Sequence, residues 1–429
     1  IMQSKGDKAL SPILGLGSFR WCSCLGSFFP DTPKVRFRST RAGASSRKNY
    51  SDCISGKKPA VKGMLFELVK KLGLMDNVDQ KIIEGDYLVH QNLDEALKQY
   101  ELAAFSRQKG ERLLRKFFSS SLRRAESLDN LAKVAKDTGR NWDALTHFLD
   151  AIRIREACFS PAWEMATSYA NAGLVILELP GHEYPRVAVG VLARAVAFCS
   201  VSLKSKVKMN GSETTSYLDL AAMHNNLGRA LLRNHKMEEA LKHFRLALAA
   251  TKVHPSQHIQ KKDGSYPEKA RATVAKCYTN IANVLADLSG SAHQSEALKY
   301  YSFALHIHEI TDHSSLETAK SHEDVALILH EIGDLNAAEQ HFQFAINIRQ
   351  FRLENEIRGD APIEDKVAFI NSLNNIALVL RDKGQLSDAL DCLNRALEKT
   401  EEGGIICTQL EVAWILGTIG RLHDEIYLE

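Results

Sequence analysis

The stretch HNNLGRALLRNHKMEEALKHFRLALAA, residues 224–250, decides the fold. It contains two helix-forming runs joined by a tight turn, with small residues at Gly228, Ala240 and Ala247. Ala240, Phe244 and Ala247 follow one another at intervals of four and three, so they lie on one stripe of an α-helix. The stretch predicts a helical hairpin whose two antiparallel helices approach closely at the small residues, while the bulky residue fills the groove between neighbouring hairpins.

The trio of alanine, large apolar residue and alanine recurs along the chain. Its seven copies are Ala96–Tyr100–Ala103, Ala144–Phe148–Ala151, Ala188–Leu192–Ala195, Ala240–Phe244–Ala247, Ala297–Tyr301–Ala304, Ala338–Phe342–Ala345 and Ala389–Leu393–Ala396. A small residue precedes the trios at Ala132, Gly173, Gly228, Ala282, Ala326 and Ala377, whereas the first copy has only Glu84 and Gly85 nearby. Because one hairpin cannot bury its apolar face alone, the hairpins must stack. The sequence therefore predicts an all-α solenoid of about seven helical hairpins.

Charge divides the chain into two predicted parts. The 429 residues have 45% hydrophobic residues, 25% charged residues and a net charge of +3. Residues 1–60 hold eleven Lys or Arg against three Asp, a net charge of +8, which leaves 3 − 8 = −5 for the rest. We expect a basic targeting or tail segment at 1–60 and the solenoid at 61–429. No uninterrupted apolar run is long enough to predict a transmembrane segment, and the eight scattered cysteines fit a reducing compartment.

From Val78 to Glu429 the chain resembles the tetratricopeptide repeat family, on the strength of the seven trios and their upstream small residues. Successive trios are 48, 44, 52, 57, 41 and 51 residues apart, longer than the 34-residue consensus. These long units resemble the kinesin-light-chain type, most clearly at Ala304–Ile348, although the heptad coiled coil of kinesin light chains is missing. The resemblance implies a right-handed superhelix and a role in protein–protein interaction.

An asparagine recurs two residues before the small residue of the first helix. The six positions are Asn130, Asn171, Asn226, Asn280, Asp324 and Asn375. Asparagine is unfavourable inside a helix because its side chain competes for backbone hydrogen bonds. The family resemblance places this register on the concave face, where amides that donate and accept can bind a partner backbone. The alternative is a structural hydrogen bond from each asparagine to the neighbouring repeat, and the two roles are compatible.

Cations and further amides occupy the adjoining registers of the predicted groove. They are Asn225, Arg229, Arg233, Lys276, Asn283, Lys320, Asn371, Asn374 and Arg381. Cations beside amides favour an acidic segment or a free carboxylate as the partner. The carboxylate clamp of chaperone-binding members is incomplete, because only Lys276, Asn280 and Asn283 match it.

Catalytic, metal and cofactor sites are not expected. The sequence has no glycine-rich phosphate loop and no cluster of metal ligands at a defined spacing. His306 and His308 are two residues apart on a helix and face different directions. The basic stretches Ser106–Glu126 and Lys252–Arg271 allow contact with nucleic acid, but a solvated helix flank and a polar loop are favoured.

The basic head resembles a mitochondrial presequence at Lys34–Lys48, where arginines alternate with small hydroxyl residues. We expect a mitochondrial protein, with a plastid or cytosolic location as alternatives. The expected function is a non-enzymatic adaptor or assembly factor that holds a partner segment in its groove. The alternatives are a permanent subunit of a large mitochondrial assembly, such as the ribosome or a respiratory complex, and a cytosolic cargo adaptor.

Overall fold

The computed structural model describes residues 78–114, 119–158, 160–207, 217–252, 268–288, 290–355, 362–402 and 415–423. These residues are helical or lie in short turns, and no strand occurs among them. The chain divides into two compact units, Ile1–Ala250 and Thr251–Glu429, which are treated separately below. The predicted head, residues 1–60, and most of Lys252–Arg271 lie outside the described residues, so those predictions stand as predictions.

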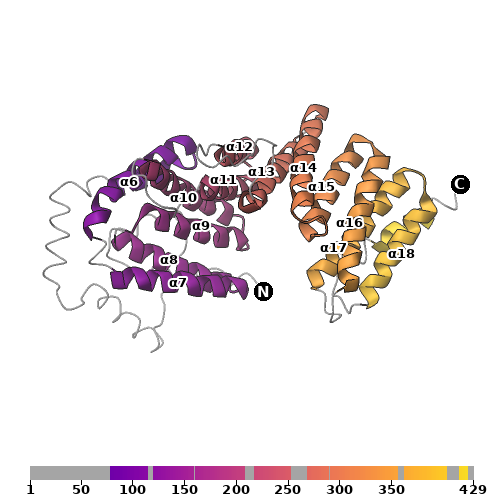
Figure 1. Ribbon diagram of the computed structural model, residues 1–429, viewed down its shortest axis with the longest axis horizontal. Helices are drawn as coiled ribbons and strands as arrows, with labels where there is room; N and C mark the ends of the chain where they lie inside the picture. The colour runs from indigo at the N-terminus through magenta and orange to yellow at the C-terminus, as the bar shows by residue number, and fades with distance from the viewer. Residues whose placement is uncertain are drawn as a thin grey trace. The chain divides into compact units, whose positions relative to one another are not determined.

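The described residues of unit 1 form four consecutive helical hairpins, which Figure 1 labels from α6 onward. Its helices are α5 (Val78–Leu88), α6 (Leu93–Leu114), α7 (Ser119–Asp137), α8 (Asn141–Ala157), α9 (Ala162–Glu178), α10 (Tyr184–Val207), α11 (Tyr217–Arg233) and α12 (Met237–Lys252). Helix α8 packs against α9, and α10 packs against α11, so consecutive hairpins stack.

The first hairpin departs from simple sequential stacking, because α6 packs along α10 (Figure 1). The buried guanidinium of Arg194 on α10 forms an ion pair with Asp86 on α5. The hydroxyl of Tyr100 on α6 donates to the same carboxylate at 2.7 Å. A second pair joins Lys204 and Glu101 at 2.7 Å. The α5–α6 hairpin is therefore fixed to the third hairpin by charges 100 residues away in the sequence, which periodicity does not predict.

Unit 2 repeats the hairpin three times (Figure 1). Its helices are α13 (Glu268–Asp287), α14 (Ser291–Asp312), α15 (Leu316–Ile332), α16 (Leu335–Asn355), α17 (Ile363–Asp382) and α18 (Leu386–Glu402), followed by a helical stretch at 415–423. Contacts run from α13 to α14, α14 to α15 and onward to α18. The described helices thus confirm the predicted all-α solenoid of about seven hairpins.

All seven trios lie in the core, and their most exposed member, Tyr301, has 8% of its surface accessible. In three hairpins the bulky residue also packs against the small residue of its own hairpin, at Gly85, Gly173 and Gly228. A Cβ atom added at Gly228 would lie 2.5 Å from the ring of Phe244. At Gly85 it would lie 2.4 Å from the ring of Tyr100, which identifies Gly85 as the small residue of the first hairpin. Glycine is required there because the ring leaves no room for a methyl group.

The turns between the two helices of a hairpin use a left-handed residue. Gly139, Gly333 and Gly384 have φ values of 73°, 93° and 77°. His235 occupies the equivalent position between α11 and α12 with φ 58°. A residue with a Cβ atom is strained in this conformation, so the α11–α12 turn departs from the others.

Helix α10 is long and apolar enough to span a membrane by length and composition, over Tyr184–Lys204. Within that span 89% of the window is buried inside the fold. Its neighbours are α6, α9 and α11, and Arg194 in its middle is paired with Asp86. These contacts are those of a core helix in unit 1.

Candidate functional site

In each unit, three polar side chains occupy the predicted asparagine register. We call these six positions the ladder. In unit 1 it consists of Asn130 on α7, Asn171 on α9 and Asn226 on α11. In unit 2 it consists of Asn280 on α13, Asp324 on α15 and Asn375 on α17. Asn130 is exposed and the other five are partly exposed, whereas the small residue two positions later is buried in every case.

Five of the six ladder side chains have no partner within the part of the chain that the structure describes. Among the described residues, Asn130, Asn171, Asn226, Asp324 and Asn375 form neither a hydrogen bond nor an ion pair, while Asn280 does engage another group. A partly buried polar group without a partner is unfavourable, so repetition of the arrangement needs another explanation than internal hydrogen bonding. This geometry favours the groove interpretation of the ladder over the structural alternative.

The structural role belongs instead to the residue immediately before the ladder. Asp129 on α7 is buried and lies 2.6 Å from the guanidinium of Arg155 on α8. Arg155 also donates to the hydroxyl of Ser168 on α9 at 2.5 Å. This clasp, made of Asp129, Arg155 and Ser168, joins one hairpin to the first helix of the next.

Unit 2 has the same clasp in Glu323, Arg349 and Ser372. Arg349 on α16 donates from Nε at 3.2 Å and from Nη2 at 2.6 Å to the two oxygens of Glu323 on α15. The hydroxyl of Ser372 on α17 donates to Glu323. The acid and the arginine are 26 residues apart in both clasps. That repeated spacing is the signal that sequence reasoning could have used and did not.

The cations of the predicted groove divide into engaged and available groups. Arg233 donates to the backbone carbonyl of Leu177, and Arg381 binds the adjacent Asp382 at 2.8 Å. Within the described part of the chain, Arg229, Lys276 and Lys320 are exposed and form no hydrogen bond or ion pair.

The amides beside the ladder are also placed by the structure. Asn283 is exposed, yet its carbonyl oxygen accepts a hydrogen bond from the hydroxyl of Tyr301 at 2.7 Å. Asn225 and Asn374 are buried and Asn371 is exposed. The ladder, the exposed cations and Asn371 therefore remain accessible to a partner.

In each unit, a contact between an acidic and a basic side chain joins the first helices of two consecutive hairpins, near the C-terminal ends of those helices. Lys136 on α7 and Glu178 on α9 lie 2.9 Å apart in unit 1. His330 on α15 and Asp382 on α17 lie 2.7 Å apart in unit 2. Both pairs stand at the same register, four and five residues after the small residue, so they fix the spacing of the helices that carry the ladder.

Asp324 is the one ionisable side chain of the ladder, and its pKa is shifted. Its pKa is raised to about 6, mainly by burial and to a smaller extent by the neighbouring Glu323, against the opposing effect of Lys320. The carboxylate is thus held in surroundings that do not compensate its charge.

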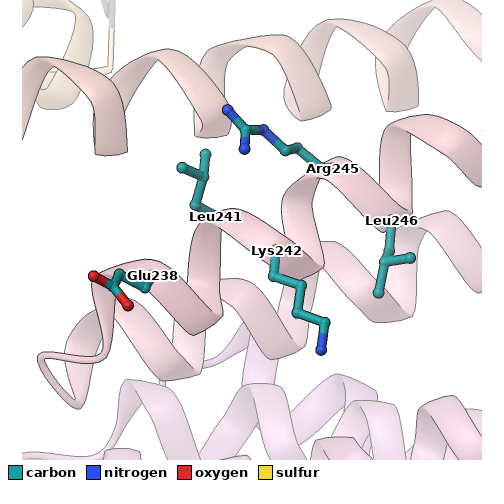
Figure 2. Close-up of a pocket in the computed structure, with 5 residues that line it drawn as sticks. All are labelled: Glu238, Leu241, Lys242, Arg245 and Leu246. Atoms are coloured by element: carbon teal, nitrogen blue, oxygen red, sulfur yellow. The ribbon is translucent and has the colours of Figure 1, made fainter. Parts of the chain in front are cut away.

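A hollow of about 470 Å³ lies over α12, away from the ladder (Figure 2). Glu238, Leu241, Lys242, Arg245 and Leu246 line it, all from the second helix of a hairpin. In Figure 2 the side chains of Leu241 and Arg245 extend to one side of α12 and that of Lys242 to the other. Lys242 is paired with Asp94, and the lining contains no set of groups suited to catalysis. No group of three metal-binding side chains occurs in the described residues.

Comparisons with known proteins agree with the repeat pattern. The profile of the tetratricopeptide repeat family matches residues 124–161 and 369–402, which contain the hairpins α7–α8 and α17–α18. No curated protein matches the chain.

Solved structures of repeat proteins align with much of the chain at low identity. BtubC from P. vanneervenii has 16% identity and a TM-score of 0.44, with 67% of this chain and 91% of that chain covered. A putative kinesin light chain with nearly identical repeats from Podosopora anserina has 16% identity and a TM-score of 0.38, with 58% and 96% covered. The assembly chaperone of RpL4, Acl4, has 14% identity and a TM-score of 0.40, with 71% and 98% covered.

The profile matches lie in both units, on hairpins whose small and bulky residues pack as the repeat requires. The chain therefore contains tetratricopeptide repeats at residues 124–161 and 369–402.

Proposed function

We propose that the chain is a mitochondrial adaptor or assembly factor that holds an extended partner segment along its ladder. Its fold is that of a protein–protein interaction scaffold. The observation that carries the finer proposal is the set of five ladder side chains that have no hydrogen-bond or ion-pair partner among the described residues. Each amide can donate to a backbone carbonyl and accept from a backbone N–H, so a row of them suits an extended peptide.

The available cations supply the chemical preference of the groove. Arg229 stands three residues after Asn226, one turn along α11, and Lys276 and Lys320 stand four residues before Asn280 and Asp324. Cations beside amides favour carboxylates on the partner. Since Arg233 and Arg381 are engaged elsewhere, we assign this role to Arg229, Lys276 and Lys320.

The ladder is tested with the triple variant Asn130→Ala, Asn171→Ala and Asn226→Ala, whose three positions all lie in unit 1. Each amide contributes about 0.5–1.5 kcal/mol as an ordinary hydrogen bond, so the triple variant should bind about a hundredfold more weakly. The probe is an immobilised library of nine-residue peptides, and the wild-type chain defines which peptides bind. The matched control changes Asn336, Asn347 and Asn394 to alanine, since these exposed asparagines lie on second helices.

Thermal melting separates the two roles of the asparagines. A groove role predicts lost binding with a nearly unchanged Tm, whereas internal hydrogen bonding predicts a lower Tm. If the triple variant melts early and its folded fraction binds the peptides with native affinity, the groove proposal is wrong.

The mitochondrial location is supported by the basic head and needs its own test. Residues 1–60 fused to a fluorescent reporter should carry it into mitochondria. Changing Arg36, Arg38 and Arg41 to glutamate should abolish import because the segment loses its positive charge. The control changes the same residues to lysine and should retain import. A wild-type fusion that stays in the cytosol would refute this location.

A further inference from the structure

Asp324 is the one ladder position that is not an amide. The other five positions are asparagines, which both donate and accept hydrogen bonds. An ionised carboxylate only accepts, so the middle position of the unit 2 ladder requires a donor from whatever binds there. Aspartate at position 324 therefore differs from the asparagines of the other positions in hydrogen-bonding chemistry but not in size.

Nothing within the described chain supplies that donor. Asp324 is partly buried on α15 and forms no hydrogen bond or ion pair with any described residue. Lys320, one turn earlier on the same helix, is exposed and forms no ion pair. Arg349 on α16 is bound to the adjacent Glu323 instead. A carboxylate that is removed from water without a partner is unfavourable, and an external cation would relieve that cost.

The surface beside Asp324 suits a long cationic side chain. Leu327 lies one helical turn further along α15, and 43% of its surface is exposed. Lysine and arginine place their methylene stems along apolar surface while the charged head stays near polar groups. Leu327 and Asp324 therefore offer adjacent surfaces for the stem and the head of one such residue.

A metal ion fits the site less well than an organic cation. Ca²⁺ and Mg²⁺ require several oxygen ligands, and the described residues contain no group of three metal-binding side chains. A guanidinium or ammonium group needs one carboxylate and makes a charge-assisted hydrogen bond with it.

We propose that Asp324 is a specificity-determining residue that binds a lysine or arginine side chain of the partner segment. The proposal rests on the proposed function, because Asn375, the next ladder position in unit 2, holds the backbone of the same segment. Unit 2 thus selects a segment with a basic residue at Asp324, while Lys276 on α13 accommodates an acidic residue nearer Asn280.

The test compares peptide binding by the wild-type chain and by Asp324→Asn, which restores the amide of the other five positions. The purified full-length proteins are applied at pH 7.5 to the immobilised library of nine-residue peptides. The control is Asp391→Asn, which makes the same charge change at an exposed position on α18, the second helix of its hairpin.

We expect peptides bound by the wild-type chain to be enriched in lysine or arginine. Asp324→Asn should bind those peptides at least tenfold more weakly, because a charge-assisted hydrogen bond is lost. Peptides without a basic residue should bind both proteins equally, and Asp391→Asn should behave as the wild type does.

Two outcomes would overturn the proposal and leave different conclusions about the ladder. If basic peptides are not enriched, or bind Asp324→Asn with unchanged affinity, while the triple asparagine variant loses binding, Asp324 does not determine specificity although the ladder binds peptides. If the wild-type chain binds no peptide in the library, the ladder proposal and the Asp324 proposal both fail.

Discussion

Arg349 binds both carboxylate oxygens of Glu323, at 2.6 and 3.2 Å, whereas the adjacent Asp324 has no partner among the described residues. Two neighbouring acids on α15 therefore have different roles: one is part of the clasp between hairpins and the other is available to a ligand. The same division separates Asp129 from Asn130 in unit 1.

The clasp predicts that Arg349→Met destabilises unit 2. The Arg349 side chain is 7% exposed and that of Glu323 is 14% exposed, so the substitution leaves a carboxylate poorly solvated. Removing one partner of such a pair costs about 3 kcal/mol. Chemical denaturation measures the loss, and hydrogen exchange should locate it in α15–α17. The control Arg352→Met removes an exposed cation from the same helix and should change stability by less than about 0.5 kcal/mol. Equal effects of the two changes would contradict a role for the clasp.

The turn between α11 and α12 predicts a stabilising substitution, His235→Gly. His235 has φ 58°, where three equivalent turns have glycine. Relief of the strained conformation should raise stability by about 0.5–1 kcal/mol. The measurement is the Tm of the two proteins, and Gly384→His should show the opposite change. A lower Tm for His235→Gly would mean that the histidine side chain contributes more than its backbone strain costs.

These features differ in how far the sequence predicted them. The sequence predicted the trios and their small residues, because hairpin packing is local and follows the helical period. All of these residues are buried in the structure. The sequence also predicted the ladder register, but it did not decide between partner binding and an internal hydrogen bond. A sequence does not show whether an asparagine side chain has a hydrogen-bond partner in the fold. The docking of α6 on α10 depends on Arg194 and Asp86, which are 108 residues apart. Such a contact depends on tertiary structure and has no periodic signal.

The histidine pair of unit 1 predicts acid sensitivity. The Nδ1 atoms of His224 and His243 lie 3.0 Å apart between α11 and α12. Burial lowers the pKa of His224 to about 3 and that of His243 to about 4. Both are neutral in the folded chain and bind protons near pH 6.5 when it unfolds. Stability should therefore fall as the pH drops from 6.5 towards 4, by about 1 kcal/mol per pH unit for each histidine.

His224→Leu tests this prediction, because Leu373 occupies the same register in the α17 hairpin. Denaturant titrations between pH 6.5 and 4 measure how the free energy of unfolding changes with pH. This slope should be smaller in the variant by the contribution of one histidine. His313→Leu, at an exposed position after α14, should keep the wild-type slope. An unchanged slope for His224→Leu would show that the pair does not set the acid sensitivity.

We predict that the Asp324 carboxylate favours ligand binding but lowers the stability of the free protein. Its pKa is raised to about 6, mainly by burial, so the folded chain at neutral pH holds a carboxylate that is less favourable than in the unfolded chain. Protonation relieves this cost: the group's contribution to stability rises as the pH falls through 6 and levels off near 4, its unfolded value. Asp324→Asn should consequently be more stable than the wild type by about 1–3 kcal/mol at pH 7.5, and the difference should shrink at pH 5.

Chemical denaturation of both proteins at the two pH values measures that difference, and the contribution of the histidines cancels because they are present in both. A gain in stability together with weaker binding of basic peptides is expected of a residue retained for its ligand, because such residues are unfavourable in the free protein. A residue that supports the fold would show the reverse, a loss of stability. If Asp324→Asn is no more stable than the wild type at pH 7.5, the carboxylate is already compensated within the fold, and the physical basis for a cationic ligand is lost.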